Sequence, residues 1–363
     1  MRRGKNAIIR LLRNMTATDS SPANLYAHFP FCRGRCSYCT LYSRGSRPAA
    51  ERDDYARRIA AAIQRLGVDG PLKTVYFGGG SPALCDLRPV LSALAPLVSS
   101  ETEFTVELHP LDATPDVLAA LRDGGVNRIS MGVQSLDDAI LAHMRRGYSF
   151  DEAERAFAAV KSQFDNAGID LIVGYPGETA AVLPRHERLR DWGLRHCSVY
   201  ALQNERGLRD AVDDETTMNR IAETAAFLAD IGLARYEISN YAAPGFECRH
   251  NLAVWRGEDY IGLGDGACGR IGRLRTRNYW GRPTEGGVAA AHFEEVVSEE
   301  FDEKERRFFR LRTREGLDAT GHPEWRRELD GFVADGLLTR DGEVYRLTAR
   351  GTEVCDAILA DLV

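Results

Sequence analysis

Three cysteines near the start of this chain have the spacing of a metal site. Cys32, Cys36 and Cys39 form a C-x3-C-x2-C pattern directly after the apolar run 25-LYAHF-29. Structural zinc takes four ligands, usually as two separated pairs, and no C-x2-C pair occurs later in the sequence. Three thiolates on one loop suit a compact [4Fe–4S] cluster instead, with one iron left open to another ligand. The pattern therefore predicts an open cluster, and three plain reduced thiols are the alternative.

The composition is that of a globular protein. The chain has 363 residues, of which 44% are hydrophobic and 28% charged. Its net charge of −6 argues against nucleic acid as a partner. Five further cysteines are scattered at positions 85, 197, 248, 268 and 355, which favours reduced thiols and a cytoplasmic location over a disulfide framework. No apolar run is long enough to span a membrane.

Residues 1–23 form a basic tail ahead of the first predicted strand. The apolar residues Ile8, Ile9, Leu11 and Leu12 are too few for a secretory signal. They allow a short amphipathic helix at the inner face of a membrane, which would make the protein a peripheral one. A plain basic tail is the simpler interpretation, and we favour it.

Strand-like runs alternate with helix-like runs over the first 200 residues. The predicted strands are 25–29, 74–77, 104–108, 128–133, 169–173 and 197–202, and the predicted helices between them are 50–66, 86–98, 115–125 and 151–164. This rhythm indicates parallel strands joined by right-handed crossovers. Six such units predict an α/β fold built on a partial (β/α)6 barrel, because a closed barrel of this type has eight.

The distinctive residues stand at the carboxyl ends of these predicted strands. The cysteine loop follows the first strand and 78-GGGSP-82 follows the second. Glu107 ends the third strand, Gln134 follows the fourth, and 174-GYPG-177 follows the fifth. Ligands of parallel α/β sheets bind at this edge, so we expect one site there.

The pattern changes twice after the barrel, which we place at residues 24–235. Residues 236–298 form an extension that includes the glycine-rich stretch 261-IGLGDGACG-269. Residues 299–363 contain helices around a predicted hairpin at Asp341-Gly342, which is typical of a small winged-helix-like α+β domain. The acidic balance of the chain favours a cap over the substrate rather than a DNA-reading unit.

Six short motifs in order resemble one known family. They are 26-YAHFPFC-32, 77-FGGGSP-82, 105-TVE-107, 128-RISMGVQS-135, 170-DLIVGYPG-177 and 236-YEISNYA-242. Together with the cysteine loop they resemble the radical S-adenosylmethionine (SAM) superfamily, in particular the oxygen-independent coproporphyrinogen III oxidase-like group and its HemW-type heme chaperones. The resemblance runs from about residue 24 to the carboxyl terminus. It implies that SAM fills the open iron site and that the reduced cluster cleaves it to a 5′-deoxyadenosyl radical. A flavodoxin-type or other donor would supply the electron.

The resemblance also assigns roles to single residues. Tyr26 would lie beside the cluster and SAM, as a catalytic residue with the three cysteines, and Tyr38 would contact the adenine. Gly79, Gly80 and Ser81 would hold the methionine end of SAM. Glu107 would bind the ribose. Gln134, Arg146 and Asp170 match positions that bind a second SAM in the oxidases, so one or two SAM molecules are expected. Ordinary salt bridges are the alternative role for Glu107 and Asp170.

Three differences divide the members of this group. The oxidases carry a further cysteine where this chain has Leu41, which argues against coproporphyrinogen III oxidation. The stretch 249-RHNLAVW-255 resembles the H-N-L-x-Y-W signature of the HemW type, which makes His250 a candidate heme ligand and Cys248 a second one. A hydrogen bond to a loop is the alternative role for His250. Val254 and Thr40 depart from the HemW pattern.

The resemblance therefore leaves two classes of function. In the first, the protein is a HemW-like carrier that binds heme or another tetrapyrrole. In the second, it is a radical SAM C-methyltransferase or cyclopropane-forming enzyme that acts on a small molecule.

Overall fold

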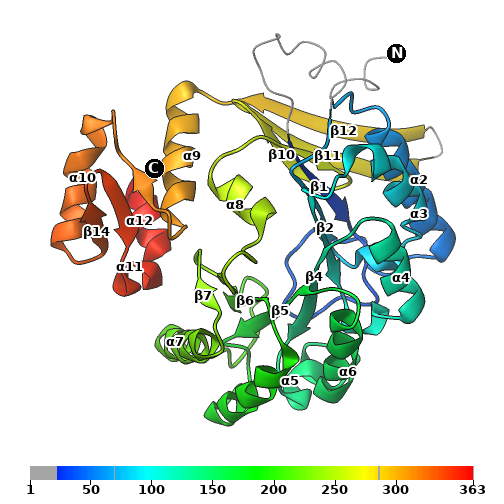
Figure 1. The fold of residues 1–363 in the computed structure, drawn as a ribbon, viewed down its shortest axis with the longest axis horizontal. Helices are drawn as coiled ribbons and strands as arrows, with labels where there is room; N and C mark the ends of the chain where they lie inside the picture. Colours follow the sequence, from blue (N-terminus) through cyan, green and yellow to red (C-terminus); the bar gives the residue numbers. More distant parts are fainter. Residues whose placement is uncertain (1–22, 69, 285–286, 363) are drawn as a thin grey trace.

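The computed structural model describes residues 23–68, 70–284 and 287–362. The predicted tail of residues 1–23 thus lies almost wholly outside the described residues. Six parallel strands form the centre of one large sheet, in the order β1-β2-β3-β4-β5-β6 (Figure 1). They are β1 (Asn24–Phe29), β2 (Thr74–Gly79), β3 (Glu103–Leu108), β4 (Arg128–Gln134), β5 (Asn166–Val173) and β6 (His196–Ala201). The predicted partial barrel is confirmed.

Helices cover the outer face of these strands. They are α2 (Ala49–Ile63), α3 (Arg88–Leu94), α4 (Pro115–Asp123), α5 (Asp138–His143), α6 (Phe150–Lys161) and α7 (Asp214–Asp230). Short 3₁₀ segments occupy Pro82–Leu84, Ala95–Leu97, Pro110–Asp112 and Ala180–Trp192. Local chemistry fixes the helix starts, as at α6, where Ser149 and Glu152 form a capping box.

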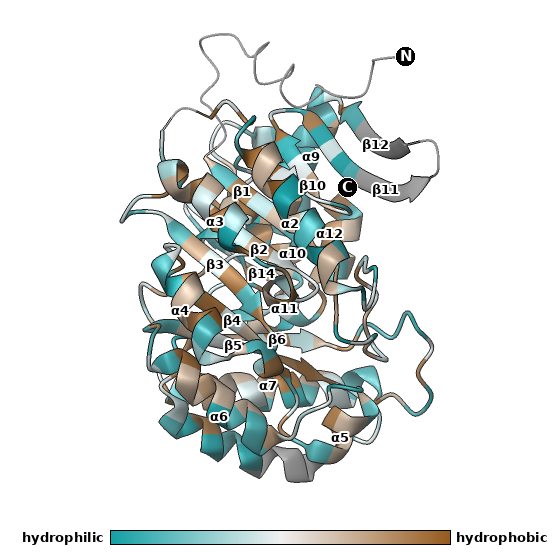
Figure 2. Cartoon of the chain, turned by 90° about the vertical axis from the view of Figure 1, so that its right-hand side faces the viewer, coloured by the Kyte–Doolittle hydropathy of each residue, from teal (hydrophilic) through white to brown (hydrophobic). Residues whose placement is uncertain are grey.

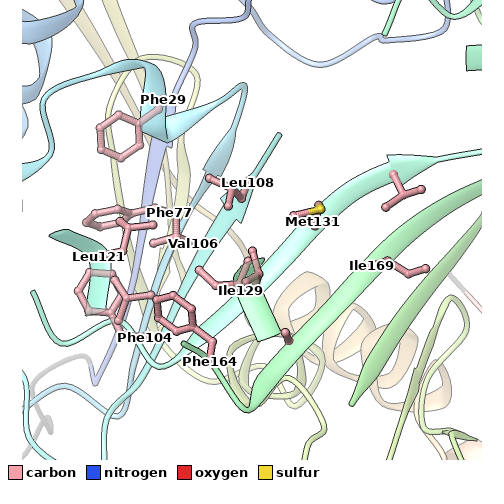
Figure 3. Packing of buried hydrophobic residues seen from close by; sticks show 14 of the residues in the cluster. Phe29, Phe77, Phe104, Val106, Leu108, Leu121, Ile129, Met131, Phe164 and Ile169 are labelled. Carbon is pink, nitrogen blue, oxygen red and sulfur yellow. The ribbon is translucent and has the colours of Figure 1, made fainter. Parts of the chain in front are cut away.

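The two faces of the central sheet differ because side chains alternate along a strand. Phe29, Phe77 and Phe104 point outward from adjacent strands and pack together, with Leu121 of α4 beside them (Figure 3). The side chains on the inner face are mostly polar. Figure 2 shows this alternation as mixed colours along the strands. The outer face therefore holds the core, and the inner face is left for chemistry.

The sheet extends beyond the barrel strands on both sides. β9 (Tyr260–Leu263) pairs in parallel with β1, and β10 (Cys268–Ile271), β11 (Leu274–Thr284) and β12 (Gly287–Val296) continue the sheet antiparallel. On the other side, β8 (Asn240–Ala242) and β7 (Ala234–Arg235) follow β6. These strands are not among the predicted ones, because glycines interrupt the alternation in the sequence near β9 and β10.

The last part of the chain has a hydrophobic cluster of its own, built around Leu329, Tyr345 and Leu359. It contains α9 (Glu299–Leu311), α10 (Pro323–Ala334), α11 (Ala349–Glu353) and α12 (Cys355–Leu362), with a small sheet of β13 (Leu317–Asp318), β15 (Val344–Leu347) and β14 (Leu338–Asp341). The predicted hairpin turn is present, and Gly342 adopts a φ of 60° there.

Helix α8 (Arg249–Trp255) lies between the barrel and this carboxyl-terminal part (Figure 1). Its amino-terminal end meets Glu103 of β3, whose carboxylate accepts hydrogen bonds from the backbone of Arg249 and His250, each at 3.0 Å. At its other end, Trp255 packs edge-on against Phe309 of α9. The helix therefore connects the inner face of the barrel to the carboxyl-terminal part.

Candidate functional site

The cysteine loop follows β1 and is held from both sides. The Cys32 amide donates to the Gly45 carbonyl at 3.3 Å, and the Cys39 amide donates to the Cys36 carbonyl at 3.4 Å. On one flank, the Ser37 and Tyr175 hydroxyls share a hydrogen bond of 2.6 Å. These contacts hold all three thiols on one short loop at the carboxyl edge of the sheet.

Two further loops clamp this one. Arg33 forms a salt bridge with Asp112, and the same aspartate accepts a hydrogen bond from the Ser81 hydroxyl. Asp112 follows β3 and Ser81 follows β2, so one carboxylate ties the cysteine loop to the ends of two strands. Asp112 is not among the residues predicted from the sequence. An aspartate two residues after a strand-end His-Pro carries no signal of its own.

The thiols themselves fit a cluster-binding role. All three are half-buried and none forms a disulfide. Burial raises the pKa of Cys32 and of Cys39, and the charges of the neighbouring thiols raise both further. Arg146 acts in the opposite direction on both, and its Nη1 atom donates to the Cys36 sulfur at 3.4 Å. Three thiolates on one loop repel one another, and a shared multinuclear metal centre would neutralise that repulsion.

The predicted glycines bring the backbone of β2 against this loop. A Cβ atom on Gly79, which has a φ of 102°, would stand 2.4 Å from the His28 ring. One on Gly80 would stand 2.3 Å from the Phe31 carbonyl oxygen. The Gly80 and Ser81 amides donate to the Phe29 and Phe31 carbonyls at 2.8 and 2.7 Å. No side chain fits here, which explains the glycines by close approach of two backbone segments.

Tyr26 is oriented by a histidine that the sequence analysis gave no role. The Nε2 atom of His28 faces the Tyr42 carbonyl at 3.0 Å, and a carbonyl can only accept, so Nε2 carries the proton. Nδ1 must then accept from the Tyr26 hydroxyl, 2.9 Å away. Burial lowers the pKa of His28 and raises that of Tyr26 well above its usual value. The pair is therefore neutral, with the hydroxyl aimed in one direction.

Glu107 lies on the inner face between two donors. The Tyr76 hydroxyl donates to one carboxylate oxygen at 2.9 Å and the Gly79 amide to the other at 3.0 Å. Burial, with a smaller effect from Asp170, raises the pKa of Glu107 to about 7. The structure shows no salt bridge to Glu107 among the described residues, so the ordinary ion-pair role considered for it is not supported there.

Asp170 and Gln134 lie on the neighbouring strands. The Ser130 hydroxyl donates to Asp170 at 3.1 Å, and burial raises the pKa of this carboxyl. Gln134 has a left-handed φ of 71°, at a register shift between β4 and β5. This shift turns the end of β4, and the amide of Gln134 comes close to Gly132. Both residues thus lie on the polar inner face.

Arg146 joins this group to the cysteine loop. It donates to the Gly132 carbonyl through Nη2 at 2.7 Å, to the Tyr148 hydroxyl through Nε at 3.0 Å, and to the Tyr38 hydroxyl through Nη1 at 3.5 Å. Tyr38 in turn packs edge-on against Tyr175. The sequence analysis did not predict roles for Tyr148 and Tyr175, because aromatic residues beside loops are common in any barrel.

His250 is not beside the cysteines. Its ring contacts Thr74 at the amino-terminal end of β2, and its backbone amide donates to Glu103 at the amino-terminal end of β3. The side chain is only 4% exposed, and burial, with the charge of Arg128, lowers its pKa to about 3. The rings of Tyr76 and Tyr26 lie next to it, with centroids 5.2 and 6.4 Å from the imidazole.

The imidazole of His250 is also fixed in one tautomer. Asn24 donates to the Asp259 carbonyl through its amide nitrogen at 3.0 Å, so its amide oxygen faces Thr74 and accepts from that hydroxyl at 2.8 Å. The Thr74 oxygen must then accept from Nδ1 of His250, 2.8 Å away. The free electron pair of His250 is therefore on Nε2. Cys248, the second candidate, is fully buried and donates to Glu103 at 3.7 Å.

The comparisons with known proteins agree with this arrangement. The family model of the Radical SAM superfamily matches residues 26–189. The heme chaperone HemW of Mycobacterium tuberculosis strain H37Rv is 31% identical, and the match covers 97% of each chain. HemW of Escherichia coli K12 is 30% identical, and the match covers 93% of this chain and 97% of that one.

The fold has a solved counterpart as well. The coproporphyrinogen III oxidase HemN of Escherichia coli superposes with a TM-score of 0.81 at 20% identity, over 99% of this chain and 93% of that one. The fold and the cysteine loop thus define a radical SAM protein, a class whose members hold a [4Fe–4S] cluster and SAM. Within that class, this chain belongs to the HemW family.

Proposed function

We propose that this protein binds heme and passes it to a recipient protein, while holding a [4Fe–4S] cluster on Cys32, Cys36 and Cys39. The observation that carries the proposal is the match to heme chaperones over almost the whole of both chains. Leu41, which replaces the further cysteine of the oxidases, supports carriage over coproporphyrinogen oxidation. The proposal places the protein in the cytoplasm, since its thiols are free and must stay reduced.

The proposed SAM site is the polar inner face next to the cysteine loop. Tyr26, Glu107, Gln134 and Asp170 are all only partly buried, so a ligand can reach them, whereas His250 below them is closed off. Bound cluster and SAM would supply a one-electron cleavage of SAM. The residues of this chain would hold the two ends of SAM, at Gly79 to Ser81 and at Glu107. We propose that this site holds one or two SAM molecules.

Heme ligation by His250 needs the barrel interior to open. The neutral imidazole with its free pair on Nε2 is the correct form for an iron ligand. However, the imidazole is buried, and the rings of Tyr76 and Tyr26 lie next to it, with centroids 5.2 and 6.4 Å away. We therefore propose that heme binds first to the partly exposed inner face and reaches His250 only if these tyrosines move.

The test is one reconstitution with two readouts. The full chain is reconstituted anaerobically with iron and sulfide, and heme is then titrated while SAM cleavage is measured with dithionite. We expect about one heme per chain and slow formation of 5′-deoxyadenosine. Rapid cleavage of SAM without any heme spectrum would overturn carriage and favour a radical SAM enzyme for a small molecule, such as a C-methyltransferase.

The cluster assignment is tested in the same preparation. Cys36→Ala should abolish the absorbance near ~400 nm that iron–sulfur clusters show, and it should remove bound iron and sulfide. Cys268→Ala is the matched control, because Cys268 is exposed and stands in β10. Equal iron and sulfide contents in the two variants would show that the site is elsewhere.

A further inference from the structure

Two partners hold Arg146 in place beside a cysteine sulfur. It lies in the short connection between α5 and α6. Its Nη2 and Nε atoms are bound to the Gly132 carbonyl and the Tyr148 hydroxyl, and Tyr148 itself donates to the Gly132 carbonyl at 2.8 Å. The remaining nitrogen, Nη1, is 3.4 Å from the sulfur of Cys36. The direction of this last hydrogen bond is therefore set by the barrel and not by the flexible side chain alone.

The charge of Arg146 is permanent in this environment. A guanidinium does not lose its proton in a protein, so Arg146 keeps its positive charge beside Cys36. Most of its N–H groups are already used within the protein, so little donor capacity is left for a second SAM molecule. A fixed cation that donates a hydrogen bond to a thiol sulfur affects the reduction potential of a metal cluster bound by that thiol.

The physical effect concerns the electron that such a cluster accepts. Reduction adds one negative charge to the cluster and its thiolates. A cation at hydrogen-bond distance from one thiolate stabilises the reduced form more than the oxidised form, and hydrogen bonds to cluster sulfurs shift reduction potentials in this direction. The shielded position of Arg146 strengthens the effect, because little water screens the charge.

We propose that Arg146 is a positioning residue that raises the reduction potential of the cluster by donating to the sulfur of Cys36. The step it influences is the transfer of one electron from an external one-electron donor to the oxidised cluster, with no bond formed or broken. The proposal depends on the cluster at Cys32, Cys36 and Cys39 and is independent of heme binding.

A neighbouring arginine provides the control. Arg206 is exposed and donates to the Cys39 carbonyl at 3.0 Å, so it brings the same charge to the loop without a contact to sulfur. Arg33 is unsuitable for this purpose, because its salt bridge with Asp112 anchors the loop. If Arg146 acts through its hydrogen bond, the two variants Arg146→Met and Arg206→Met must differ.

The experiment is a redox titration of the reconstituted full chain, with the signal of the reduced cluster followed by electron paramagnetic resonance. At a fixed ambient potential, Arg146→Met should lower the ratio of reduced to oxidised cluster about tenfold, which corresponds to about 59 mV for one electron. Arg146→Lys, which keeps the charge but loses the planar fork, should show a smaller loss. Arg206→Met should stay within about twofold of the unaltered protein.

Two results would overturn the proposal. One is an unchanged potential in Arg146→Met, and the other is an equal shift in Arg206→Met, which would indicate only the general charge of the loop. If Arg146→Met takes up no cluster, Tyr148→Phe decides the question. This variant keeps Arg146 and its charge but removes the hydroxyl that orients it. It should lower the ratio severalfold, and an unchanged ratio would reject the role of Arg146.

Discussion

The hydroxyl of Tyr76 donates a hydrogen bond to the carboxylate of Glu107 across 2.9 Å. The two residues lie on adjacent strands, and both point to the inner face of the barrel. Tyr76 also packs at a tilt against His250, with 5.2 Å between ring centroids. Tyr76 therefore links Glu107, in the proposed SAM site, to the buried His250. The first and third predictions below concern these two residues.

Glu107→Gln should make the protein more stable at high pH. The ordinary pKa of the carboxyl is 4.5 and the folded protein raises it to about 7. A raised carboxyl pKa means that folding favours the protonated form, so stability is full below about pH 4.5 and falls as the pH rises through about 7. The amide removes this loss and can still bond to Tyr76 and Gly79. We expect a gain on the order of 2 kcal/mol at pH 8.5 and little change at pH 5, measured by urea unfolding. Equal differences at both pH values would contradict the raised pKa.

Gly80→Ala should destabilise the fold, whereas Gly34→Ala should not. A Cβ atom on Gly80 would overlap the Phe31 carbonyl oxygen at 2.3 Å, so the β2 end and the cysteine loop must separate. Overpacking of this kind costs about 1–3 kcal/mol. Gly34 lies in the cysteine loop itself, and a Cβ atom there would meet nothing within 4 Å. The comparison is made by thermal unfolding of both variants, and similar melting temperatures would rule out the close approach.

His250→Ala should weaken heme binding at least about tenfold without loss of the iron–sulfur cluster, because an axial ligand is removed. Thr74→Val should have a smaller effect in the same direction, since it frees the Nδ1 proton of His250 and with it the choice of tautomer. Heme titrations followed in the Soret band measure both. His322→Ala, which changes a more exposed histidine near α10, is the control. If it weakens binding as much as His250→Ala, then His250 is not a ligand.

Asp302→Asn should loosen the contact between α9 and the sheet extension. Asp302 accepts from Arg270 and Arg275 at 2.7 Å and from Arg306 at 2.9 Å. Burial would raise its pKa, but Arg275, Arg306 and Arg270 hold it below the ordinary value of 3.8. Its contribution is therefore present above about pH 4 and is lost as the pH falls further.

The expected cost of Asp302→Asn is about 3 kcal/mol at pH 7, because three guanidinium groups lose their shared acid. Urea unfolding at pH 7 and at pH 3 measures it, and the difference from the unaltered protein should shrink at the lower pH. Glu300→Gln removes an exposed acid of the same helix, which pairs with Lys304, and should change stability by less than about 1 kcal/mol. A cost as large for Glu300→Gln would point to helix charge rather than the buried cluster.

None of the described helices is long and apolar enough to cross a membrane. The amphipathic helix considered for the basic tail falls outside the described residues, so any contact of this protein with a membrane surface stays a prediction.

Local patterns in the sequence determined the central strands, the helices between them and the residues that gather at the strand ends. Along each strand, every second residue faces the core, as Phe77 does in β2 and Phe104 in β3. This period of two can be read from the sequence because one face of the sheet is buried. The spacing of Cys32, Cys36 and Cys39 likewise predicted the loop and its chemistry, since all three thiols lie within eight residues. The resemblance assigned the glycines at 79 and 80 to the methionine end of SAM, and their close approach to His28 and Phe31 came only from the structure.

Only the tertiary structure decided what lies beside these residues. Arg146 is 110 positions from Cys36 and His250 is 176 from Thr74, and no local pattern reports such contacts. The tautomers of His28 and His250 follow from single carbonyl and amide partners, Tyr42 and Asn24, which are also fixed by the fold alone. The sequence thus determined which groups are present, and long-range packing decided the charge, direction and exposure that each group has.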